Sequence, residues 1–217
     1  MRKIIIGKNS KLYKNFKNDF LEIFDLAISH KDISSFNFQP NDFILFLSYP
    51  RSLSALNKLT SLLTKIKKNK VVLLSTCSIV VNNLTNCYSY PKIKLLQEKY
   101  FSKTLHNLII FRVGTIISKR DYVNYYGTCI LYEKVFFKMI NDFINNNSND
   151  QLVTKFDILD FQGSFFESFV YKFYCGLISI LIPFPCILRP LDFIVRLFGK
   201  PWYGYVALTK IISEENK

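Results

Sequence analysis

The chain has 217 residues, 49% of them hydrophobic and 16% aromatic, and this content of core-forming side chains excludes an intrinsically disordered protein. Its formal net charge is +13, but the lysines are spread along the chain, which argues against a nucleic-acid-binding protein. Five cysteines without ligand spacing, together with only two histidines, support neither a disulfide framework nor a metal site.

The first half of the chain alternates short apolar runs with helical periodicities. In chain order, the predicted elements are a strand over 3–7, a helix over 10–24, a strand over 25–29, a loop over 30–36, a strand over 41–48, a helix over 52–68, a strand over 70–78, a helix over 90–103 and a strand over 107–116. The strands are continuously apolar, as in strands covered on both faces. This series predicts an α/β fold, a Rossmann-like doubly wound parallel sheet.

The pattern weakens after about residue 118. Residues 129–147 predict a helix, and residues 151–161 predict a strand that returns to the core near 151–158. From residue 164 the chain is apolar and aromatic and is interrupted by prolines.

We therefore expect a cofactor-binding core over 1–118 and a small, apolar helical C-terminal lobe over 119–217. The longest apolar stretch of the tail, 173–188, is shorter than the roughly 20 residues that span a bilayer. Two alternatives stay open for the tail. It forms a packed lobe over a substrate site, or it makes peripheral membrane contact through 164–205, with Trp202 at the interface.

Tyr90 and Lys94 lie one turn apart on one face of the predicted helix 90–103. In a hydride-transfer site, a tyrosine hydroxyl acts as general acid or base, while a lysine favours its ionised form and holds the cofactor ribose. A hydroxyl at the end of the preceding strand orients the same substrate oxygen, and Ser75 and Thr76 fill that position. This constellation predicts a catalytic site.

Two weaker signals accompany this cluster. Tyr88 and Lys92 form a second pair with the same spacing, which ranks behind the first because the helical periodicity continues from Tyr90. The turn after the first strand keeps Gly7 alone of the three glycines in a dinucleotide fingerprint, although Ser10 is small enough for a phosphate to approach. A plain strand–turn–helix remains the alternative there.

In chain order, these segments resemble an extended short-chain dehydrogenase/reductase, the class that includes NAD-dependent epimerases and dehydratases of nucleotide sugars. The matching segments are "IIIGKNSKL", "NDFILFLS", "VVLLSTCS", "YPKIKLLQE" and "LIIFRVGTI". The later "LVTKFDILDF" and the proline-interrupted tail are similar to the family's last strand and its sugar-binding lobe.

The resemblance implies NAD or NADP as cofactor and a role for each matching residue. The implied catalytic residues are Tyr90 as acid or base, Lys94 as its partner and Thr76 as the hydroxyl helper. The implied cofactor-binding residues are Gly7, Asn9, Ser10, Lys11, Lys31, Asp32, Leu47, Ser48 and Lys94. The implied substrate contacts are Ser75, Arg112 and Gly114.

The residues alone leave other roles open. Asp32 fits a turn or a helix cap as well as an adenine contact, and Arg112 fits a structural ion pair as well as a phosphate contact. The short N-terminal apolar run does not fit a signal peptide, so we expect a cytoplasmic protein, either free or at the inner face of the membrane.

The leading functional hypothesis is an NAD(P)-dependent epimerase or reductase that acts on a nucleotide-activated or lipid-linked sugar in surface polysaccharide biosynthesis. Its partner is a nucleotide-sugar substrate, with no nucleic acid, and a homodimer is left open. One alternative is a catalytically degenerate Rossmann-fold protein with a cofactor-sensing or structural role. Another is a peripheral membrane protein of a glycan-assembly complex.

Overall fold

The computed structural model describes residues 1–50, 52–83, 89–118, 129–145, 151–158 and 164–190. The chain forms two compact units. The first unit comprises residues 1–75, 93–112 and 134–154, and the second comprises residues 76–92, 113–133 and 155–217. The domain boundary at residue 118 stays a prediction.

A six-stranded sheet in the order β2-β1-β3-β4-β5-β8 forms the centre of the first unit. The strands are β1 (Lys3–Ile6), β2 (Leu26–Ile28), β3 (Phe43–Phe46), β4 (Lys70–Thr76), β5 (Asn107–Val113) and β8 (Leu152–Lys155). The pairs β1–β2, β1–β3 and β3–β4 are parallel, and Ile6 lies between Ile28 and Phe46. The predicted doubly wound α/β sheet is confirmed.

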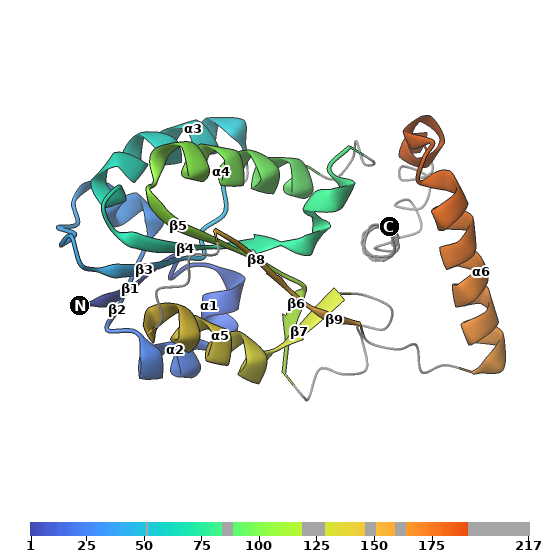
Figure 1. The fold of residues 1–217 in the computed structure, drawn as a ribbon, viewed down its shortest axis with the longest axis horizontal. Coiled ribbons are helices and arrows are strands. Elements are labelled where there is room, and N and C mark those ends of the chain that lie inside the picture. Colours follow the sequence, from blue (N-terminus) through green and yellow to red (C-terminus); the bar gives the residue numbers. More distant parts are fainter. Residues whose placement is uncertain (51, 84–88, 119–128, 146–150, 159–163, 191–217) are drawn as a thin grey trace. The chain divides into compact units, whose positions relative to one another are not determined.

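Helices cover both faces of this sheet (Figure 1). On one face lie α3 (Leu53–Leu62) and α4 (Tyr90–Thr104), and on the other lie α1 (Lys11–Asn15), α2 (Lys17–Ile23) and α5 (Glu133–Asn145). Short 3-10 helices follow β2, α3 and β4, namely η1 (His30–Ser34), η2 (Leu63–Ile66) and η3 (Cys77–Val81). The loop predicted over 30–36 therefore contains a helical turn.

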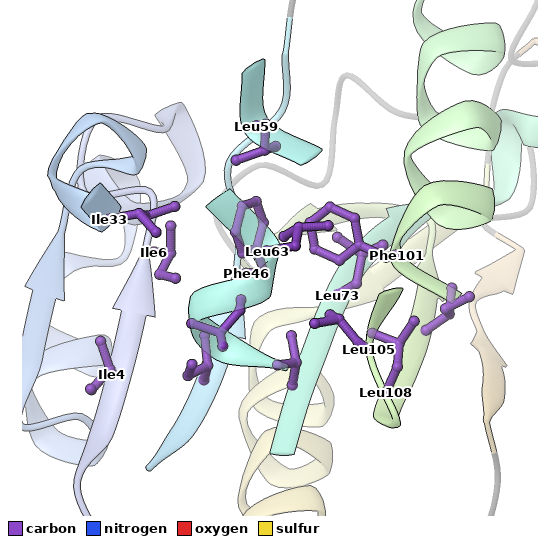
Figure 2. Packing of buried hydrophobic residues seen from close by; sticks show 14 of the residues in the cluster. Ile4, Ile6, Ile33, Phe46, Leu59, Leu63, Leu73, Phe101, Leu105 and Leu108 are labelled. Atoms are coloured by element: carbon purple, nitrogen blue, oxygen red, sulfur yellow. The ribbon is translucent and has the colours of Figure 1, made fainter. Parts of the chain in front are cut away.

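The sheet is buried on both faces, as its continuously apolar strands predict. One core cluster joins alternate strand residues to α3, η2 and α4 (Figure 2). Its fully buried members include Ile4, Ile6, Ile44, Phe46, Leu63, Leu73 and Phe101. On the other face lies a phenylalanine layer made of Phe16, Phe20, Phe111, Phe136, Phe137 and Phe143, each with its ring centroid within 6.2 Å of another.

The helix predicted over 10–24 is two helices, because the backbone leaves helical geometry at Phe16 (φ −119°, ψ 36°). Phe16 ends α1 and precedes α2. Its buried ring meets Phe137 edge-on, with the centroids 6.1 Å apart. The break in the helix accompanies the packing of this ring against α5, and it leaves α1 with five residues.

Two predictions for the second half of the chain need correction. The helix predicted from residue 129 begins at Glu133, because Cys129–Tyr132 forms β7 between β6 (Thr115–Ile117) and β9 (Asp157–Ile158). A short apolar run cannot be assigned to strand or helix by periodicity alone. The single strand predicted over 151–161 is two short strands, β8 and β9, in different sheets, and its last residues lie outside the described part.

The second unit contains this three-stranded sheet, in the order β6-β7-β9, and the long helix α6 (Phe165–Leu181). Strand β7 is parallel to β6 and antiparallel to β9. Among the described residues, no helix combines the length and the apolar character that crossing a membrane requires. Trp202 and the rest of the tail beyond residue 190 lie outside the described residues.

The substitution Gly7→Ala should destabilise the protein by about 1–3 kcal/mol, because Gly7 has φ +128° and an added Cβ would lie 2.9 Å from the Ser48 amide nitrogen. Urea unfolding measures the change. Gly176→Ala is the matched control, since an added Cβ there meets nothing within 4 Å, and its helical position predicts no loss. Equal stability of the Gly7 variant and the wild type would contradict the role assigned to this turn.

Candidate active site

The first unit has its topological switch point between β1 and β3, because β2 lies on one side of β1 and the remaining strands lie on the other. Gly7 follows β1 there, and Leu47 and Ser48 follow β3. The amides of Leu47 and Ser48 donate to the Ile6 carbonyl at 2.9 and 3.2 Å. Leu47 and Ser48, which are predicted to bind the cofactor, thus lie beside Gly7, a third such residue. This is the edge of the sheet where ligands of doubly wound folds bind.

The turn that follows Gly7 is tightly closed. The Ser10 amide donates to the Gly7 carbonyl at 2.8 Å, and the Ser10 hydroxyl caps α1 by accepting from the Tyr13 amide at 3.1 Å. Asn9 and Lys11 are exposed beside it. Tyr13 is 7% exposed and stacks on Phe20 with ring centroids 5.6 Å apart, so its ring belongs to the core and not to the turn.

Asp32 lies in η1, after β2, and takes the capping role that the residues alone left open. Its carboxylate accepts from the Ser29 amide at 3.2 Å, while the Ser29 hydroxyl accepts from the Lys31 amide at 3.3 Å. Lys8 lies 3.6 Å from the same carboxylate, with both side chains about half exposed. Lys31 and the half-exposed carboxylate of Asp32 both follow β2. Their contact with the adenosine part of a cofactor stays a prediction.

Helix α4 buries a face that mixes apolar and polar side chains. Its buried residues include Ile93, Lys94, Gln97, Glu98 and Phe101, which recur at helical spacing. Leu95 and Leu96 of the same helix are only half-buried. Three polar residues therefore occupy positions that an ordinary amphipathic helix gives to the core.

Lys94 is 4% exposed, and its ammonium donates to the Leu74 carbonyl on β4 at 2.8 Å. The same nitrogen lies 5.7 Å from the centroid of the Tyr49 ring, which follows β3. Burial lowers the pKa of Lys94 from 10.5 to about 8, and the neighbouring Glu98 carboxylate acts in the opposite direction. A buried amine thus lies against the end of β4, and its catalytic role stays a prediction.

Gln97 was not predicted as a site residue. Its side chain is fully buried, and its amide nitrogen donates to the Ser48 carbonyl at 3.0 Å, which ties α4 to the end of β3. The Gln97 amide oxygen and the Ser75 hydroxyl at the end of β4 are buried atoms for which the described residues provide no hydrogen-bond partner. The only sequence signal for Gln97 was a polar residue three positions after Lys94 on the same helix face.

Arg112 forms a bidentate ion pair with Glu98, at 2.7 and 3.1 Å, within the first unit. Glu98 is 4% exposed, so the pair neutralises a buried carboxylate. Of the two roles that the residues left open for Arg112, the structural ion pair is observed, and its substrate contact stays a prediction.

Three predicted site residues belong to the second unit. The Thr76 hydroxyl caps η3 by accepting from the Ser78 amide at 3.2 Å, and it lies 3.0 Å from the Ser78 hydroxyl. Tyr90 is half-buried and is the first residue of α4, one turn before Lys94 along the helix. Gly114 leaves room for β7, because an added Cβ would lie 2.4 Å from the Cys129 carbonyl oxygen. Tyr88, of the second Tyr–Lys pair, lies outside the described residues.

No protein-family model matches the chain, and no curated protein sequence matches it significantly. Among solved structures, the chain is similar to dTDP-4-dehydrorhamnose reductase from Bacillus anthracis in complex with NADP, with 14% identity and a TM-score of 0.52 over 81% of this chain and 80% of that chain. It is also similar to an NAD-dependent NDP-hexosamine 5,6-dehydratase involved in tunicamycin biosynthesis, with 12% identity and a TM-score of 0.50 over 72% of this chain and 75% of that chain.

A capsular polysaccharide assembling protein from Staphylococcus aureus also matches, with 17% identity and a TM-score of 0.48 over 73% of this chain. The match covers 54% of that protein, so the chain spans about half its length. At these identities the likeness concerns the fold alone. The Rossmann-like fold that the sequence resemblance implies is confirmed, and the site residues stay predictions.

Raising the pH from 8 to 10 should stabilise the wild type relative to the variant Lys94→Met. Between the folded pKa of about 8 and the ordinary value of 10.5, the unfolded chain binds the proton that the folded chain releases, so stability rises with pH. The difference in unfolding free energy between the two proteins should rise by up to about 3 kcal/mol. Urea titrations across this range measure it, with Lys99→Met, at an exposed position of the same helix, as the control.

The substitution Arg112→Met should lower the unfolding free energy by about 3 kcal/mol, because it leaves the buried Glu98 carboxylate without its partner. Arg112→Lys keeps the charge but loses the bidentate geometry, so its loss should be smaller. Urea unfolding at neutral pH compares the two. A Met variant as stable as the Lys variant would show that the ion pair does not support the α4–β5 contact.

Proposed function

We propose that the protein is an NAD(P)-dependent enzyme that acts on a nucleotide-activated sugar, as an epimerase or a reductase. The observation that carries this proposal is Lys94, a buried amine at the end of β4 and one helical turn after Tyr90. Burial of an amine is unfavourable, so a fold that keeps one beside the ligand-binding edge of its sheet favours a chemical role.

The residues at the sheet edge fit a nicotinamide dinucleotide in two respects. Gly7 lets the backbones of β1 and β3 approach each other, because a side chain at this position would meet the Ser48 amide nitrogen. The lack of a side chain at Gly7 also leaves its position in the switch point open to a pyrophosphate. The buried Ser75 hydroxyl has no partner among the described residues and offers a hydrogen bond at the end of β4. Gly7, Leu47, Ser48 and Lys94 are the residues that would hold the cofactor.

A bound nicotinamide supplies the hydride acceptor or donor in this chemistry. In the proposed reaction, the Tyr90 hydroxyl takes the proton from a sugar hydroxyl as that carbon loses its hydride, and returns a proton in the reverse step. The Lys94 ammonium favours the ionised tyrosine that accepts this proton. A hydroxyl from Ser75 or Thr76 orients the sugar oxygen.

The substrate class rests on the reductase and the dehydratase named above, whose substrates are nucleotide sugars. The reductase is in complex with NADP and the dehydratase is NAD-dependent, which supports a nicotinamide cofactor in general. The sugar itself, a role in surface polysaccharide biosynthesis, a cytoplasmic location and a homodimer stay predictions.

A second candidate is a protein that binds the cofactor without turnover. The Lys94 ammonium already donates to the Leu74 carbonyl and lies over the Tyr49 ring, and the Ser10 hydroxyl is used as a helix cap. These contacts compete with the ribose and the pyrophosphate for the same groups. The two candidates differ in whether Tyr90 takes part in chemistry.

The substitution Tyr90→Phe should lower turnover at least a hundredfold and leave cofactor affinity within about twofold, because a general acid/base contributes about 10²–10⁴ in rate. Calorimetric titration with NAD and NADP measures binding, and cofactor absorbance with a panel of nucleotide sugars measures turnover. Tyr88→Phe is the matched control and should change neither.

Three outcomes separate the candidates. Binding and turnover that Tyr90→Phe abolishes support the enzyme. Cofactor binding without turnover on any sugar of the panel, unchanged in Tyr90→Phe, supports the degenerate protein. Absence of binding to both cofactors rejects both candidates.

A further inference from the structure

Two buried side-chain amides hold the backbone at opposite ends of the strands β3 and β4. At the amino ends, the Asn69 amide nitrogen donates to the Gln39 and Asp42 carbonyls, at 2.6 and 3.2 Å. At the carboxyl ends, the Gln97 amide nitrogen donates to the Ser48 carbonyl at 3.0 Å. Asn69 is 2% exposed and Gln97 is fully buried. Of these two amides, Gln97 lies at the edge where ligands of doubly wound folds bind.

The Gln97 side chain leaves one of its polar atoms unpaired. Its amide oxygen is buried and has no hydrogen-bond partner among the described residues, and the same holds for the Ser75 hydroxyl. Ser75 follows Val71 and Leu73 at alternate positions of β4, which places its side chain on the sheet face that α4 covers. Both unpaired atoms therefore lie in the layer between α4 and the sheet.

Away from the carboxyl ends of the strands, apolar side chains fill this layer. Phe46 of β3 meets Phe101 of α4 edge-on, with the ring centroids 4.9 Å apart, and both belong to the apolar core cluster (Figure 2). Gln97 lies one turn before Phe101 on the same helix face. A methionine of about the same size would fill its position without the cost of burying an amide. Packing alone therefore does not account for a glutamine here.

The hydrogen bond from Gln97 fixes the peptide group that follows Ser48. The Ser48 amide donates to the Ile6 carbonyl at 3.2 Å and its carbonyl accepts from Gln97, so the residue is held on both sides. The peptide bond between Ser48 and Tyr49 is trans, so the Tyr49 N–H points opposite to the Ser48 carbonyl and away from α4. Without the Gln97 amide, the Ser48 carbonyl would lose the contact that sets this orientation.

Polar side chains attach α4 to two neighbouring strand ends. Lys94 donates to the Leu74 carbonyl of β4 at 2.8 Å, and Gln97, three residues later, donates to the Ser48 carbonyl after β3. An added Cβ at Gly7 would lie 2.9 Å from the Ser48 amide nitrogen. The position of the turn after β3 is therefore set from two sides, by Gly7 and by the helix that carries Lys94.

We propose that Gln97 is a positioning residue for the nicotinamide cofactor, and that it acts by holding the Ser48 carbonyl toward α4. It sets the backbone of the turn after β3, where Ser48 is proposed to contact the cofactor, and does not touch the cofactor itself. This role rests on the proposed function, because it requires that the protein bind NAD or NADP.

Calorimetric titration of the full chain with NAD and NADP tests this role. Gln97→Met keeps the length of the side chain and removes the amide. It should weaken binding of the preferred cofactor about tenfold, the factor that corresponds to the loss of about one hydrogen bond. Gln97→Leu should weaken binding by a similar factor. The two apolar side chains differ in shape, so their agreement separates the loss of the amide from a packing defect.

The matched control is Asn69→Leu, which removes the other buried amide at the opposite ends of the same two strands. Thermal unfolding should show a lower melting temperature for both Gln97→Met and Asn69→Leu, because each removes the amide donor from a backbone carbonyl. Gln97→Met should also lose cofactor affinity, whereas Asn69→Leu should bind like the wild type.

Two results overturn the proposal and leave the proposed function standing. One is wild-type cofactor affinity in the folded Gln97 variants. The other is an equal loss of affinity in Gln97→Met and Asn69→Leu, which reports general destabilisation. If the wild type binds neither cofactor, the proposed function fails, and the role of Gln97 fails with it.

Hydrogen exchange of the wild type adds a measurement that depends on no variant. Cofactor binding should slow amide exchange in peptides that contain Ser48 and leave peptides that contain Asn69 unchanged. If the cofactor binds and exchange at Ser48 stays the same, Gln97 cannot act through this residue, and the proposal is overturned.

Discussion

The close approach of Gly7 to the Ser48 amide is the constraint on which the first unit depends. It lets β1 and β3 end side by side at the switch point, because a Cβ at Gly7 would meet the backbone of β3. The Ser48 carbonyl in turn accepts the Gln97 amide, which holds the polar face of α4 against the same edge. The backbone of Ser48 thus connects three parts of the sequence. Its amide lies against the Gly7 turn after β1, and its carbonyl accepts the hydrogen bond from α4.

The buried face of α4 contains polar and charged side chains, whose desolvation costs free energy that an apolar face would not cost. Lys94, Gln97 and Glu98 occupy positions between Ile93 and Phe101 that a structural helix fills with apolar side chains. Burying charges is unfavourable unless each finds a partner. Glu98 finds its partner on β5 and Lys94 on β4, whereas one Gln97 oxygen finds none among the described residues. Polar groups that remain buried at such a cost favour a role in recognition or chemistry over one in packing.

Sequence patterns predicted those elements whose structure depends on residues nearby in the chain. They failed where contacts with distant residues determine the structure. The alternation of strands and helices, and the Tyr90–Lys94 spacing, are local properties, so the doubly wound sheet and the first turn of α4 could be foreseen. The break at Phe16 depends on a ring of α5 about 120 residues away, which no local periodicity contains. The same holds for β7, whose partners fix it as a strand, and for Gln97, whose partner is a carbonyl of β3.

The phenylalanine layer sets an order on the formation of the first unit. Phe20 and Phe16 come from α2 and its start, but the rings of Phe136 and Phe137 that pack against them belong to α5. Contacts between segments so far apart must close a large loop before they gain any packing energy, which slows folding. During synthesis, Phe16 and Phe20 therefore lack the α5 rings that pack against them until the chain has been made to about residue 145. An apolar surface that the finished structure hides is thus open during synthesis, and transiently exposed surface of this kind favours aggregation.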